Sequence, residues 1–87
     1  MTGKLLRVVP NLKSYNFPGT FYTQLVFLVN DKQVKCDVTE GLRGYEKWRE
    51  IIDNGKGKDV SGLQFYKTKN GKNYIAIQKS FPKIINN

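Results

Sequence analysis

The sequence has no histidine and a single cysteine, Cys36, and both shortages exclude kinds of chemistry. One cysteine cannot form a disulfide within the chain, and without histidine the usual metal-binding sets and the usual catalytic base are missing. A nuclease would need clustered carboxylates for its metal ions, yet the close candidates, Asp37 and Glu40, are explained by a strand face and a helix start. We therefore expect no metal, no cofactor and no enzymatic activity.

Long apolar runs are also missing. No run approaches the roughly 18 residues of a membrane span, and the first residues, Met-Thr-Gly-Lys, lack the apolar block of a signal peptide. We expect a soluble, cytoplasmic protein with no membrane partner. Its 87 residues predict one domain, residues 1–87, with a core large enough for a single barrel or sandwich.

Acidic residues are absent from both ends of the chain. All seven lie between positions 31 and 59, and they are Asp31, Asp37, Glu40, Glu46, Glu50, Asp53 and Asp59. Residues 1–30 and 60–87 carry only basic charges, and the net charge is +8. Segregation of this kind is typical of a polyanion-binding face with an acid-bearing far side, although a generic basic surface is the simpler alternative.

The hydrophobic pattern predicts three strands in the first part of the chain. The first covers residues 4–9, and Pro10 fits only at the edge of that strand, at a bulge or at its end, so a bend is expected there. Residues 21–29 form a nearly continuous apolar run, as in a central strand. In residues 33–38 apolar and polar side chains alternate, which places Cys36 on a buried face as a small hydrophobic residue.

Tyr22 lies near the start of the second predicted strand. Alternation puts its side chain on the face opposite Phe21 and Leu25, which we expect in the core. Tyr22 is therefore either an ordinary half-buried tyrosine or a ring that is shown to solvent and to a ligand.

The segment of residues 11–20 predicts a loop or an irregular hairpin, because a Pro-Gly pair supplies a turn. It carries Lys13 together with two aromatic residues, Tyr15 and Phe17. Two interpretations remain open. Either the aromatic residues form a second arm for stacking, or Phe17 packs into the core while Tyr15 stays on the surface.

One helix is predicted, over residues 39–54. The apolar residues at helical spacing are Leu42, Tyr45, Trp48 and Ile52. An Asn-Gly pair gives a C-terminal stop, and the outer face carries charges of both signs, as a solvated helix surface does. We therefore expect Trp48 in the core, under the helix.

Residues 60–79 predict one β-hairpin. A two-residue Asn-Gly turn would mix apolar and polar side chains on both faces, whereas a three-residue loop at 69–71, with Gly71 left-handed in a bulge, makes one face wholly apolar. The cross-strand pairs in that register are Leu63 with Ile77, Phe65 with Ile75, and Tyr66 with Tyr74.

Tyr66 and Tyr74 then lie side by side on the outside, near a lysine-rich tip. The lysines around them are Lys67, Lys69 and Lys72. Rings on a strand surface with cations nearby suit unstacked bases and their phosphates. The alternative is an exposed tyrosine pair that stabilises a hairpin amid solvating lysines.

The predicted order is strand, strand, strand, helix, strand, strand, which is the order of an OB-fold, a five-stranded barrel. In that fold the loops between strands one and two and between strands four and five flank the binding face. Here those loops correspond to residues 13–20, which combine lysine with aromatic residues, and 67–73, which carry three lysines between Tyr66 and Tyr74; neither loop contains an acid.

The chain resembles small OB-fold single-stranded DNA-binding proteins, especially those of phages and mobile elements. The resemblance rests on this architecture, on the size of the chain, and on the segments YKTKNGKNY and KSYNFPG. The resemblance covers the chain from Lys4 to about Ile85. It implies that Tyr66, Tyr74 and Tyr22 stack on bases, and Tyr15 joins them if its loop is a second stacking arm. The lysines that the resemblance assigns to phosphates are Lys13, Lys67, Lys69 and Lys72.

The function we expect is binding of single-stranded DNA with little sequence preference, in DNA replication or recombination, inside the host cell if a phage encodes the chain. Two alternatives remain. One is an RNA-binding protein with an OB or cold-shock-like barrel, because stacking platforms serve either polymer. The other is a protein-interaction module whose exposed tyrosines contact a partner. The oligomeric state is left open, and a homo-oligomer is compatible with each of these functions.

Overall fold

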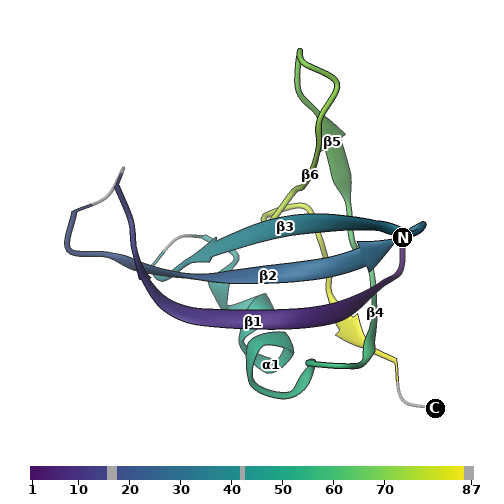
Figure 1. Ribbon diagram of the computed structural model, residues 1–87. Coiled ribbons are helices and arrows are strands. Elements are labelled where there is room, and N and C mark those ends of the chain that lie inside the picture. Colours follow the sequence, from purple (N-terminus) through teal and green to yellow (C-terminus); the bar gives the residue numbers. More distant parts are fainter. Residues whose placement is uncertain (16–17, 42, 86–87) are drawn as a thin grey trace.

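The protein is mostly β-strand, with one helix in the described part of the chain (Figure 1). The computed structural model describes residues 1–15, 18–41 and 43–85. Strands β1, β2 and β3 cover Gly3–Lys13, Phe21–Val29 and Lys32–Thr39, and helix α1 covers Tyr45–Asn54. Strands β4, β5, β6 and β7 cover Asp59–Ser61, Phe65–Lys67, Asn73–Ile75 and Lys83–Ile84. The predicted succession of three strands and a helix is confirmed.

Two antiparallel sheets make up the fold. The larger has the order β3-β2-β1-β4-β7, while β5 and β6 form a separate hairpin. Strand β6 lies beside β3, but no ladder joins them within the described residues, so the sheet is not closed into the expected five-stranded barrel. Figure 1 shows α1 below the β1–β2–β3 sheet and the β5–β6 hairpin rising past the β3 edge of the sheet, so that the helix and the hairpin tip lie at opposite ends of the view.

Strand β1 is longer than predicted, because an irregularity accommodates Pro10 inside it. The register with β2 shifts between Val9 and Leu12, and Asn11 has a φ of 62°. Proline has no N–H for the ladder and asparagine tolerates left-handed backbone, so the strand continues past both. The expectation that Pro10 fits at a bulge is confirmed, while residues 11–13 belong to the strand and not to the predicted loop.

Helix α1 begins at Tyr45, later than the predicted start at Thr39. Strand β3 runs through Thr39, and Gly41 and Gly44 have φ values of 81° and 95°, which exclude a continuous right-handed helix there. Leu42, expected on the apolar stripe, lies outside the described residues. The helix ends where the Asn-Gly pair predicts.

The predicted hairpin of residues 60–79 is divided at Gly62. Strand β4 pairs with β1 in the large sheet, and the separate hairpin begins only at β5. Gly62 has a φ of 79°, and a Cβ at this position would overlap the carbonyl of Phe81, whose N–H donates to the Gly62 carbonyl at 2.9 Å. The chain thus leaves the large sheet at a position where only glycine fits, which is why β5 and β6 do not extend the ladder.

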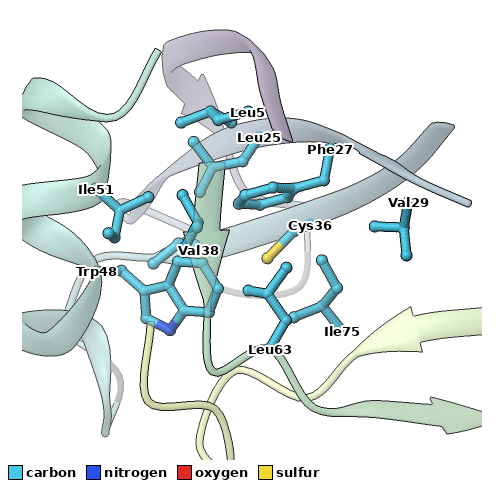
Figure 2. Packing of buried hydrophobic residues seen from close by; sticks show 11 residues of the cluster. Leu5, Leu25, Phe27, Val29, Cys36, Val38, Trp48, Ile51, Leu63 and Ile75 are labelled. Carbon is cyan, nitrogen blue, oxygen red and sulfur yellow. The ribbon is translucent and has the colours of Figure 1, made fainter. Parts of the chain in front are cut away.

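The core lies between the large sheet, helix α1 and the base of the hairpin. Figure 2 shows the inward side chains of the sheet facing Trp48 and Ile51 from the helix and Leu63 from the β4–β5 connection. Trp48 is fully buried, and its ring meets the ring of Phe27 edge-on at a centroid distance of 6.2 Å. The predicted burial of Trp48 and of Cys36 is confirmed.

A single turn at residues 76–80, called the 76–80 turn below, is held by side chains of α1. Trp48 donates from Nε1 to the carbonyl of Ile77 at 3.2 Å. Lys47 donates from Nζ to two carbonyls of the same turn, at 2.7 and 2.8 Å. Carbonyls at the end of a helical turn have no hydrogen-bond donor within the turn, and here Trp48 and Lys47 of α1 provide the donors. The expectation of a merely solvated outer helix face is therefore wrong for Lys47.

Ser80 fixes the other side of this turn. Its buried hydroxyl accepts a hydrogen bond from the N–H of Gln64 at 2.9 Å and donates one to the carbonyl of Ala76 at 2.7 Å. The N–H of Ala76 in turn donates to the carbonyl of Gln64 at 2.7 Å. The base of the hairpin, the 76–80 turn and α1 therefore form one hydrogen-bonded unit.

Replacing Trp48 by alanine is expected to destabilise the protein by about 3 to 5 kcal/mol, as for other large buried aromatic side chains. The substitution empties the centre of the core and leaves the Ile77 carbonyl without its indole donor. Chemical denaturation followed by circular dichroism measures the free energy of unfolding. An unchanged value would contradict the packing of α1 on the sheet.

Gly62→Ala is expected to lower stability more than Gly57→Ala, although the two glycines have similar φ values of 79° and 81°. At Gly57 nothing lies within 4 Å of the new methyl group, whereas at Gly62 it meets the backbone of Phe81. The Gly57 variant therefore measures the conformational cost alone, about 1 to 2 kcal/mol. Thermal denaturation compares the variants, and equal melting temperatures would show that the close approach at Gly62 is absent.

Candidate nucleic-acid interface

The β5–β6 hairpin has the register that the sequence predicts. Its cross-strand pairs are Phe65 with Ile75, Tyr66 with Tyr74, and Lys67 with Asn73. The N–H of Gly71 donates to the carbonyl of Thr68, and the N–H of Thr68 donates to the carbonyl of Lys72, both at 3.0 Å. With Gly71 at a φ of 78°, this is a type I turn followed by a left-handed glycine bulge. The further predicted pair, Leu63 with Ile77, is not part of the ladder, because Ile77 belongs to the 76–80 turn.

Tyr66 and Tyr74 form a stacked pair, called the tyrosine pair below, on the exposed side of the hairpin. Their ring centroids lie 5.7 Å apart and their planes differ by 26°. The residues are 52% and 40% exposed, while Ile75 on the opposite face is buried. The predicted juxtaposition on the outside is confirmed. Strand backbone holds both rings, which makes them a platform of the kind on which unpaired bases stack.

Exposed lysines surround the tip of the hairpin, at Lys67, Lys69 and Lys72. Among the described residues, the one ion pair within 4.0 Å joins Arg49 to Glu46 on helix α1. No described acidic side chain is therefore paired with the three tip lysines. Their positive charge lies next to the tyrosine pair and is available to an anion.

The β1–β2–β3 sheet has an outer face that points away from helix α1. Directly opposed residues on neighbouring strands point to the same side, so the registers define rows of side chains across this face. The rows are Lys4–Leu28–Gln33, Arg7–Val26–Lys35, Val9–Gln24–Asp37 and Leu12–Tyr22–Thr39. The inner face carries Leu5, Leu25 and Phe27 into the core. The outer face thus combines basic and apolar side chains, as a nucleic-acid surface does.

A hollow of about 330 Å³ joins the tyrosine pair to the outer face. Its lining includes Tyr66, Tyr74, Gln24, Lys35 and Asp37. Gln24 donates from Nε2 to Oδ1 of Asp37 at 3.4 Å. The expectation that all acids lie on a far side is therefore wrong for Asp37, which alternation along β3 turns outward together with Lys35.

Lys13 at the end of β1, Tyr15 in the β1–β2 loop and Tyr22 in β2 line a second hollow, of about 680 Å³. Tyr22 is half-buried on the outer face, and Tyr15 is 98% exposed. Lys13 pairs with Phe21 and so belongs to the face opposite Tyr22. Phe21, expected in the core, is 41% exposed because it stands at the end of β2. Phe17, the other aromatic residue of this loop, lies outside the described residues.

The predicted site residues therefore fall into two groups. Tyr66, Tyr74 and the tip lysines lie at the hairpin, whereas Lys13, Tyr15 and Tyr22 lie at the loop end of the sheet. In Figure 1 the β1–β2 loop lies at one end of the long strands, and the hairpin rises next to β3.

Sequence reasoning missed two basic residues of the outer face, Arg7 and Lys35. Both are exposed, and both oppose Val26, from β1 and from β3. Alternation within each strand places them on a polar face. That they form one row across three strands follows only from the pairing registers of β1 with β2 and of β2 with β3. The first of these registers shifts by one residue at Leu6.

Cys36 is a neutral thiol packed in the core. It is 3% exposed, and burial raises the pKa of the thiol far above its usual range, with a further contribution from the charge of Asp37. Among the residues that the structure describes, no group of three or more histidine, cysteine, aspartate or glutamate side chains is arranged to hold a metal ion.

Comparisons with protein-family models, with curated proteins and with solved structures give no match to this chain. In the described part of the chain, no helix is long and apolar enough to cross a membrane.

Cys36 is expected to resist a disulfide reagent in the native protein at mildly alkaline pH, because its raised pKa keeps the thiolate, the reactive form, nearly unpopulated. The same reagent should react rapidly after denaturation. Absorbance of the released thiolate measures both rates. Rapid labelling of the folded protein would contradict the buried position of the side chain.

Proposed function

We propose that the protein binds single-stranded DNA with little sequence preference, and that its fold is a partly open OB-fold. OB-folds bind oligonucleotides on the face of strands two and three and with the loops that join strands one and two and strands four and five. The corresponding parts here are the outer face of β2 and β3, the β1–β2 loop and the β5–β6 turn. The position of α1 after the third strand and the return of β4 to β1 support this correspondence.

The observation that carries the proposal is the exposed tyrosine pair, set between the lysine-rich tip and the outer face. Stacking of a base on an aromatic ring contributes about 1 to 3 kcal/mol and accepts every base, because every base has a π face. Such a platform binds unpaired strands, whose bases are free to leave their own stack. It supports binding with little dependence on sequence.

Positive charge supplies the second part of the affinity. The exposed cations are Lys67, Lys69 and Lys72 at the hairpin tip, Lys35 beside the hollow, and Arg7 in the same row of the outer face as Lys35. They lead from the hairpin tip, past the hollow beside the tyrosine pair, to the basic row of the outer face. A strand that follows them places its phosphates on the cations and its bases on the rings. Replication and recombination are the processes in which such strands are exposed.

RNA fits the same rings and cations, and an exposed tyrosine pair also suits a protein partner. Competition binding with single-stranded DNA, duplex DNA and RNA at two salt concentrations separates these functions. The proposal predicts that single-stranded DNA competes best. A clear preference for RNA would reassign the polymer, and no binding to any of the three would favour a protein-interaction module.

Lysine and tyrosine substitutions are expected to respond differently to salt. If the five cations each contact one phosphate, the logarithm of affinity should fall with the logarithm of salt at a slope of about −3.5, from about −0.7 per contact. Lys69→Gln or Lys72→Gln should flatten the slope by about one contact. Tyr66→Ala or Tyr74→Ala should cost about 1 to 3 kcal/mol with the slope nearly unchanged. Fluorescence titration on oligo-dT at several salt concentrations measures both effects.

Two matched variants control this experiment. Lys56→Gln removes an exposed charge from the α1–β4 connection, away from the platform, and should leave the slope unchanged. Tyr66→Phe keeps the ring and should keep most of the affinity. Alanine variants of the tyrosine pair that bind like the wild type would remove stacking from the mechanism, and binding that is independent of salt would remove nucleic acid altogether.

A further inference from the structure

We propose that Asp37 and Gln24 contact the edge of a base that stacks on the tyrosine pair, and that they give the platform a modest preference for guanine. The inference rests on the proposed function, which it deepens. Binding remains broad, because most of the affinity comes from stacking and from phosphate contacts that every sequence supplies.

The geometry places both side chains beside the rings. Gln24 and Asp37 are cross-strand partners on β2 and β3, and they line the same hollow of about 330 Å³ as Tyr66 and Tyr74. The hydrogen bond of 3.4 Å from Gln24 Nε2 to Asp37 Oδ1 orients the amide next to the carboxylate. A base lying on the tyrosine pair therefore has its edge near a carboxylate and an amide held by sheet backbone.

The charge of Asp37 needs an explanation on this surface. In the rows of the outer face it is the one acidic residue, and the other charged members are Lys4, Arg7 and Lys35. A carboxylate repels phosphate, so it weakens binding to the strand backbone. It can instead accept hydrogen bonds from base edges, as aspartate and glutamate do with the amino group of cytosine. Asp37 therefore fits a base and not a phosphate.

The donors of each base decide the order of preference. Guanine presents an N1–H and an amino group side by side, which match the two oxygens of one carboxylate. The amide nitrogen of Gln24 has a second hydrogen for the adjacent O6 of guanine. Cytosine and adenine offer an amino group next to an unprotonated ring nitrogen, and thymine offers one N–H between two carbonyl oxygens that repel a carboxylate. The expected order is guanine first and thymine last.

The test uses oligo-dT of about 12 nucleotides, within the length that an OB-fold covers, and versions in which every third base is guanine, cytosine or adenine. Fluorescence titration of the wild-type protein should show about fivefold tighter binding of the guanine version than of oligo-dT, the lower end of the discrimination given by a bidentate contact. Asp37→Asn should abolish this preference. The same variant should bind oligo-dT as well as the wild type or better, because a repulsive charge is gone.

Asp53→Asn is the matched control, since it removes one exposed carboxylate from helix α1 and should keep the guanine preference. Equal affinity of the wild type for guanine and thymine strands would overturn the inference and leave the proposed function intact. A preference that survives in Asp37→Asn would overturn the role of Asp37. Failure of the wild type to bind any of the strands would overturn the inference and the proposed function together.

Discussion

The hydrogen bonds from helix α1 to the 76–80 turn hold the β5–β6 hairpin in its position beside the sheet. The β5–β6 hairpin has no ladder with the large sheet within the described residues, so its placement depends on its base. There Trp48 and Lys47 bind the carbonyls of the turn, while Leu63 and Ile75 are buried in the core. Hydrogen bonds and apolar burial therefore both hold the hairpin at its base. This attachment holds the tyrosine pair beside β3, where the pair lines a hollow together with residues of the outer face.

The sequence predicts best those features that local chemistry decides. The register around Tyr66 and Tyr74 follows from the need for one apolar face and from a glycine that accepts the left-handed bulge. The burial of Trp48 follows from helical spacing, and that of Cys36 from alternation along a strand. In each case a single element contains the whole pattern, so no knowledge of its neighbours is required.

The features that escaped prediction depend on contacts between distant segments. The division of the long hairpin at Gly62 requires the approach of the Phe81 backbone, which no local pattern reveals. The late start of α1 has two causes: β3 pairs with β2 as far as Thr39, and the left-handed backbone at Gly41 and Gly44 then delays the helix. Asp37 reaches the tyrosine pair only because β6 lies beside β3. The order of charges along the chain therefore did not predict that Asp37 lies beside the tyrosine pair.

The opposite placement of α1 and the hairpin also has a kinetic consequence. Helix α1 carries three acidic and two basic side chains, a net charge of −1, whereas the hairpin tip carries three lysines, and Figure 1 shows the helix and the tip at opposite ends of the molecule. Such a separation of charge gives the molecule a permanent dipole, which turns it in the field of a polyanion before contact is made. Encounters then begin at the hairpin tip, and the strand reaches the rings from there. At physiological ionic strength, salt screens the electrostatic interaction between the dipole and the polyanion to a range of about 8 Å. The protein is therefore oriented only in the last part of its approach.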